Sequence, residues 1–187
     1  MQIDVAFANP IGPYNNIFNR IIPKYCHCEL SFHTTTSHLK RMVVQHMETN
    51  KDELIKLKKR LDKINGKIIV CFFITWGSTV SCRFLTELID DPYHRPPEQP
   101  VYDVKSLKVT MEQMDNLIFF YLKNLGKPYD YVRALLCLLP YTLRECDYNS
   151  FFCSQLVLKS LIDAKIFKKE GDINENHITP SELYKLL

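Results

Sequence analysis

A cysteine at the expected start of a late helix is the residue of this sequence best placed for chemistry. The stretch NSFFCSQLVLKSL, residues 149–161, is almost unbroken in apolar residues, and Ser150 is its expected N-cap, which makes Cys153 the third helical residue. Backbone N–H groups and the positive dipole end of a first turn favour a thiolate over a thiol. Cys153 is therefore a candidate nucleophile, and the competing interpretation is a small core residue.

A candidate base lies near the N-terminus, in the stretch KYCHCELSFH at residues 24–33. Side chains alternate between the two faces of a strand, so His27 and Glu29 share one face while Cys28 and Leu30 occupy the apolar face. A carboxylate on the same face can orient and charge an imidazole, as the third member of a catalytic triad does. The alternative is a solvated surface pair.

The remaining pattern predicts alternating strands and helices. Strands are expected at 3–7, at 101–109, and on both sides of the turn Trp76, Gly77 and Ser78. Helices are expected at 14–22, at 50–64 with Asn50 and Glu53 as a cap pair, after Thr110 with Gln113, at 129–139, from Ser150, and after Thr179 with Pro180 and Glu182. A proline-rich loop, DDPYHRPPEQP, fills 90–100.

Composition restricts the class of protein. With 187 residues, 46% hydrophobic and 24% charged, we expect one domain over 1–187 with a helical insertion at about 48–66. A net charge of +3 gives no reason to expect a nucleic-acid partner. The N-terminus does not read as a secretory signal, and the longest apolar run, 134–139, is too short to cross a bilayer. We therefore expect no transmembrane segment, a cytoplasmic protein, and seven reduced cysteines.

Four stretches together resemble a known family. YCHCELSF, GKPYDY, SFFCSQLV and TPSELYKLL, in this order, resemble the permuted form of the NlpC-type papain-like proteins, found in bacteria and large DNA viruses and more distantly in relatives of lecithin retinol acyltransferase. In that group the histidine strand precedes the cysteine helix. The resemblance implies an α+β fold, a circularly permuted papain-like domain in which an antiparallel sheet packs on helices.

The resemblance also implies roles for individual residues. Cys153 becomes the nucleophile, His27 the general base, and Tyr129 of the GKPYDY motif a residue near the substrate. Same-face geometry selects Glu29 as the third member. Relatives often supply that member from the strand after the histidine strand, which keeps Gln45, His38 and Thr75 as alternatives.

The expected function is a thiol protease, amidase or acyltransferase that acts on a peptide-like amide or a lipid ester through a thioester, without a cofactor. An alternative is a non-catalytic papain-like scaffold that binds a protein partner, for instance in virion assembly. A viral member would then be located in the host cytoplasm or in the virus particle. The loop at 90–100 could form part of the binding interface. A third reading is a zinc site at Cys26, His27 and Cys28. Its spacing fits poorly because adjacent strand residues point to opposite faces.

Overall fold

The structure is a computed structural model of the chain, and it describes residues 1–8, 24–75, 77–85, 102–137, 148–168 and 173–187. The strands are β1 (Gln2–Ala8), β2 (His27–Thr35), β3 (Lys67–Phe73), β4 (Ser81–Leu85) and β5 (Tyr102–Lys108). The helices are α2 (Thr36–Gln45), α3 (Lys51–Leu61), α4 (Met111–Asn124), α5 (Tyr131–Leu136), α6 (Cys153–Asp163), the 3-10 helix η1 (Glu175–His177) and α7 (Pro180–Leu186). The predicted helix at 14–22 and the proline-rich loop at 90–100 lie outside the described residues.

The strands form one antiparallel sheet in the order β4-β3-β2-β1-β5. The first four strands follow one another as neighbours, and β5 closes the opposite edge by pairing with β1. One face of β1 and β2 carries Val5, Phe7, Leu30 and Phe32, all buried, because apolar residues alternate along both strands. The α+β class and the antiparallel sheet are thus confirmed.

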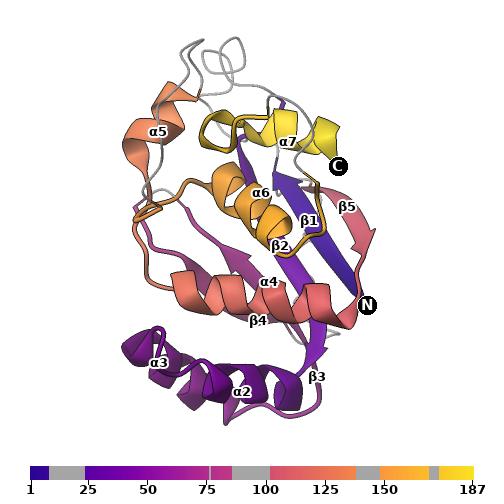
Figure 1. Cartoon of the computed structure of the whole chain (residues 1–187), viewed down its shortest axis with the longest axis vertical. Coiled ribbons are helices and arrows are strands. Elements are labelled where there is room, and N and C mark those ends of the chain that lie inside the picture. Colours follow the sequence, from indigo (N-terminus) through magenta and orange to yellow (C-terminus); the bar gives the residue numbers. More distant parts are fainter. Residues whose placement is uncertain (9–23, 76, 86–101, 138–147, 169–172) are drawn as a thin grey trace.

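Helices cover the apolar face of this sheet (Figure 1). α6 packs against β2, and α4 packs against α6, with the Ser160 hydroxyl of α6 donating to the Tyr121 hydroxyl of α4 at 3.2 Å. Both expected capping boxes are present, at Thr110 with Gln113 and at Thr179 with Glu182. None of the helices within the described ranges is long and apolar enough to cross a bilayer.

The segment between β2 and β3 holds two helices, where the sequence pattern predicted one. α3 was expected, whereas α2 was not assigned to any element. Asn50 is the N-cap of α3, but its side chain makes no cap hydrogen bond; its amide donates to the Leu125 carbonyl at 2.8 Å, so the predicted cap pair with Glu53 is wrong. The buried leucines of α3, at 54, 57 and 61, belong to the main core.

Candidate active site

The helix that carries the candidate nucleophile begins at Cys153 itself. Phe152, in an extended conformation, is the N-cap of α6, and no side chain caps the helix. The predicted role of Ser150 as N-cap is therefore wrong. Ser150 lies two residues before the cap position, and its hydroxyl donates instead to Asp130 Oδ2 at 2.8 Å. Cys153 lies closer to the helix N-terminus than predicted, with the positive end of the dipole directly beside its sulfur.

The GKPYDY segment fixes the backbone that leads into Cys153. The Phe151 N–H donates to the Pro128 carbonyl at 3.1 Å, and the Asp130 N–H donates to the Phe151 carbonyl at 2.8 Å. Tyr129 and Phe151 form a parallel bridge between them. Burial, and then the charge of the Cys153 thiolate, raises the pKa of Tyr129 above its usual range. Tyr129 therefore lies close enough to Cys153 to sense its charge.

The C-terminal segment that begins at Ile178 and continues into TPSELYKLL joins the histidine strand to the cysteine helix. The Ser154 hydroxyl, next to the candidate nucleophile, donates to the Ile178 carbonyl at 2.5 Å. Three residues later in this segment, the Ser181 hydroxyl accepts a hydrogen bond from the Tyr25 N–H at 2.9 Å, just ahead of β2. This segment thus contacts both the start of α6 and the residue just ahead of β2.

His27 opens β2 and lies between Cys153 and Glu29. Its Nε2 is 3.8 Å from Glu29 Oε2, an ion-pair distance, and its side chain is 19% exposed. Burial lowers the pKa of His27, but hydrogen bonding with Cys153 and the neighbouring Glu29 carboxylate raise it by more, to about 9. The imidazole therefore holds its proton at neutral pH.

The Cys153 side chain is 5% exposed and yet favours the thiolate. Hydrogen bonding from the Cys28 thiol lowers the pKa of Cys153, whereas burial raises it. The hydrogen bond and the positive charge of His27 lower it further, so the pKa lies well below the usual value. Cys28 lies on the apolar face of β2, toward α6. The lowered pKa of Cys153 and the raised pKa of His27 both favour a thiolate–imidazolium pair, and the raised pKa of Cys28 favours a neutral thiol as an additional donor.

Glu29 connects this pair to an arginine on a distant strand. Its side chain is 3% exposed, and Arg83 Nη2 of β4 lies 2.5 Å from its Oε1. Burial raises the pKa of Glu29, but the hydrogen bond of His27 and the charge of Arg83 lower it below the usual range. The same-face prediction for His27 and Glu29 agrees with this geometry, and the solvated surface pair does not, because Glu29 is buried.

The other residues considered for the third position make different contacts. His38 of α2 contacts Asp115 through Nε2 at 2.7 Å and Thr34 through Nδ1 at 2.9 Å. Gln45 is exposed at the end of α2. The Thr75 N–H bonds the Ser78 hydroxyl at 2.9 Å. Neither α2 residue belongs to a strand, because the chain folds into a helix directly after β2.

Two residues that contribute to the candidate active site, Cys28 and Arg83, were not predicted from the sequence. Cys28 was assigned to the core, and the apolar alternation around it gave no signal of a thiol donor. Arg83 alternates with buried Cys82 on β4, but its distance from Glu29 depends on the register of β3 between them, where Cys71 pairs with Arg83 and Ser31. The available signal was a charged residue in the middle of a short strand that otherwise holds no charge.

Within the described residues, no group of three or more potential ligands is placed to hold a metal ion. The described cysteines, including Cys26, Cys28 and Cys153, are free thiols. Comparison with known proteins adds no assignment: no protein-family model, no curated protein and no solved structure matches the chain.

Proposed function

We propose that this protein is a cysteine-dependent hydrolase or acyltransferase that cleaves an amide or ester bond through a thioester on Cys153. The observation that carries the proposal is the line of interacting groups Cys153, His27, Glu29 and Arg83, drawn from α6, β2 and β4. A nucleophile, a proton carrier and an orienting carboxylate are the parts that covalent acyl transfer requires.

The steps follow from the protonation states. The Cys153 thiolate attacks the carbonyl carbon, and an S–C bond forms while the carbonyl π electrons move to oxygen. Within α6 the first hydrogen bond runs from the Leu156 N–H to the Phe152 carbonyl at 2.9 Å, so the N–H groups of the first turn have no intrahelical acceptor and can face the oxyanion. The C–N or C–O bond then breaks, and the imidazolium of His27 gives its proton to the leaving group.

Deacylation reverses the proton transfer. Neutral His27 accepts a proton from water, which gives a carboxylic acid, or from a second acceptor, which gives the transferred acyl product. The attack breaks the thioester and releases Cys153 as a thiolate. Glu29, held by Arg83, keeps the ring oriented and stabilises its charged form in both half-reactions.

The order of elements supports a permuted papain-like arrangement. The histidine is on a strand early in the chain and the cysteine opens a later helix that packs on this strand. The GKPYDY segment bonds to Phe151 just ahead of α6, and Ile178, directly before TPSELYKLL, accepts a hydrogen bond from Ser154 of α6. Ser181 of TPSELYKLL accepts one from Tyr25 of YCHCELSF, so hydrogen bonds link all four stretches that carry the family resemblance. We propose peptide-like amides as the first substrate class and lipid esters as the second.

A thiol-directed acyl probe tests the proposal. Incubation with a p-nitrophenyl ester should release a burst of nitrophenol and leave an acyl group on Cys153, detected by peptide mass spectrometry. The Cys153→Ser variant should show neither, and Cys82→Ser, which changes a buried thiol of β4, serves as the matched control. Undiminished labelling of Cys153→Ser refutes the proposal. A folded wild-type protein that forms no acyl adduct would support the non-catalytic scaffold instead.

A further inference from the structure

A second hollow lies at the far end of β2, away from the candidate active site. It has a volume of about 750 Å³ and is bordered by the end of β2, the first turns of α2 and the start of β3 and α4. On β2 its lining begins at His33, six residues after His27, which at the rise of a strand is roughly 20 Å along β2. The two sites therefore do not share a ligand.

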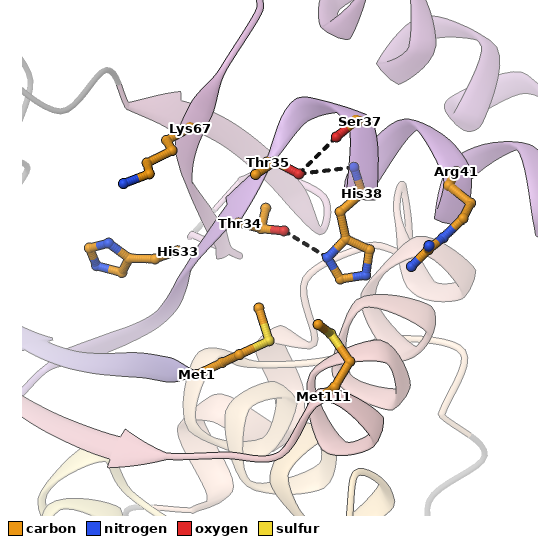
Figure 2. A pocket seen from close by; sticks show the side chains of 9 residues that line it. All are labelled: Met1, His33, Thr34, Thr35, Ser37, His38, Arg41, Lys67 and Met111. Atoms are coloured by element: carbon orange, nitrogen blue, oxygen red, sulfur yellow. Dashed lines mark hydrogen bonds between the residues drawn. The ribbon is translucent and has the colours of Figure 1, made fainter.

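Positive side chains lie at opposite sides of this hollow. Figure 2 shows Lys67 and His33 at one side, Arg41 at the other, and Thr34 with His38 between them. The two histidines already face carboxylates: His33 lies 3.4 Å from Asp4 Oδ2, and His38 lies 2.7 Å from Asp115 Oδ1.

The other two cations of the hollow, Arg41 and Lys67, differ from the histidines in their ion-pair partners. Among the described residues, neither Arg41 nor Lys67 has a carboxylate within ion-pair distance, and both are exposed. Two separated positive charges thus remain for a ligand.

The backbone that carries these cations is held rigidly. Thr36, the first residue of α2, exchanges hydrogen bonds with Gly66: its N–H donates to the Gly66 carbonyl at 2.9 Å, and its hydroxyl accepts from the Gly66 N–H at 3.1 Å. Lys67 follows Gly66 and pairs with Thr35 in the β2–β3 ladder. These contacts join the start of α2, the helix that carries Arg41, to the start of β3, which carries Lys67.

The lining between the two cations is mixed in polarity. The Thr35 and Ser37 hydroxyls lie 3.0 Å apart at the start of α2, and Met1 and Met111 form an apolar wall on the other side of the hollow (Figure 2). Polarizable thioethers adapt to apolar groups of varied shape. The hollow therefore offers an anion contact at each side and an apolar contact between them.

We propose that this hollow binds a small organic bisphosphate, with one phosphate at Lys67 and the other at Arg41, and with the carbon skeleton between them against Met1 and Met111. A guanidinium presents a planar fork that matches phosphate oxygens, and a lysine ammonium binds phosphate as a point charge. A ligand with a single phosphate satisfies only one side. This proposal does not depend on the chemistry of Cys153.

Calorimetric titration with two matched probes tests the proposal. Hexane bisphosphate and hexyl phosphate differ in the second phosphate alone, and we expect the bisphosphate to bind at least tenfold more tightly at physiological ionic strength. Arg41→Gln and Lys67→Gln should each weaken hexane bisphosphate about tenfold, to roughly the affinity of hexyl phosphate. Lys59→Gln, which removes an exposed charge from α3, is the matched control and should bind as the wild type does.

Two kinds of result would overturn the proposal. Equal affinity of the two probes, or no binding of the bisphosphate, overturns the proposal. An equal loss of affinity in Lys59→Gln shows a diffuse charge effect and overturns it as well. Because Arg41, Lys67 and Lys59 are exposed, all three variants are expected to fold, and their thermal melting should match that of the wild type.

Discussion

Replacing Glu29 by glutamine tests the electrostatic link between His27 and Arg83. The substitution keeps the shape of the side chain but removes the charge that lies 3.8 Å from His27 Nε2. At an effective dielectric constant of about 20, two unit charges at this distance interact by about 4 kcal/mol. Solvent at the His27 ring, which is 19% exposed, screens part of this, so we expect about half.

A loss of about 2 kcal/mol corresponds to a fall of between about 1 and 2 units in the pKa of His27, from its value of about 9. The weaker imidazolium stabilises the thiolate less, so the pKa of Cys153 should rise in the same variant. The pH range in which the pair is charged thus narrows from both sides. NMR titration of the His27 ring protons measures the first change, and the pH dependence of Cys153 alkylation measures the second.

The matched control is Asp4→Asn, which removes a carboxylate beside another β2 histidine, His33, at 3.4 Å. His27 should titrate as in the wild type in this control. If Glu29→Gln leaves the His27 titration unchanged while the protein stays folded, Glu29 does not charge the imidazole, and its place in the catalytic line is refuted.

Three further predictions follow from the same geometry. Cys28→Ala should raise the pKa of Cys153, because the thiolate loses its strongest hydrogen-bond donor; an unchanged pH profile of alkylation would exclude Cys28 from the site. Thr179→Ala should lower the free energy of unfolding by about 1 kcal/mol, since it removes the α7 capping box, and urea denaturation at matched pH measures this; no change would contradict the capping role. The contribution of the Cys153–His27 pair to stability is the difference in free energy of unfolding between the wild type and the double variant Cys153→Ala/His27→Gln. This difference should rise from acid pH to about 6.5 and then stay level to about 9. A continuous rise between a pH of about 6.5 and about 9 would contradict the assigned protonation states.

The pH dependence of this stability is set by the number of protons that the folded and unfolded states bind. Between the lowered pKa of Cys153 and a pH of about 6.5 the unfolded chain binds a proton on both groups, whereas the folded pair binds one, so stability increases with pH. Between about 6.5 and 9 each state binds one proton, on Cys153 when unfolded and on His27 when folded, and the slope vanishes. Stability is lost as the pH falls through the lowered pKa of Cys153.

The sequence predicted the site best where local chemistry decides the structure. Strand alternation placed His27 and Glu29 on one face, and the apolar run of α6 placed Cys153 in its first turn. Both follow from short-range rules that the fold did not override. Ser150 failed as a cap because α6 begins two residues later than predicted, with Phe152 at the cap position, and the Ser150 hydroxyl bonds Asp130 instead.

Features that depend on register or on competing propensities were missed. Arg83 reaches Glu29 only because β3 sets the offset between β2 and β4, and nothing in the local sequence specifies that offset. α2 begins in a run of threonines, which favour strands, yet Leu39, Met42 and Val43 are buried at helical spacing. The threonine at 35 ends the strand and caps the helix, so β propensity hid the boundary.

Cys153 is expected to be a thiolate at neutral pH because the Cys28 thiol donates to it and the charged His27 lies beside it. Alkylation by iodoacetamide at a pH of about 6, followed by peptide mass spectrometry, compares all thiols of the chain in one sample. Cys153 should be modified first, although it is less exposed than Cys26, and His27→Gln should remove this preference. Modification of Cys153 only near the pKa of an ordinary thiol, at about 8.5, would contradict it.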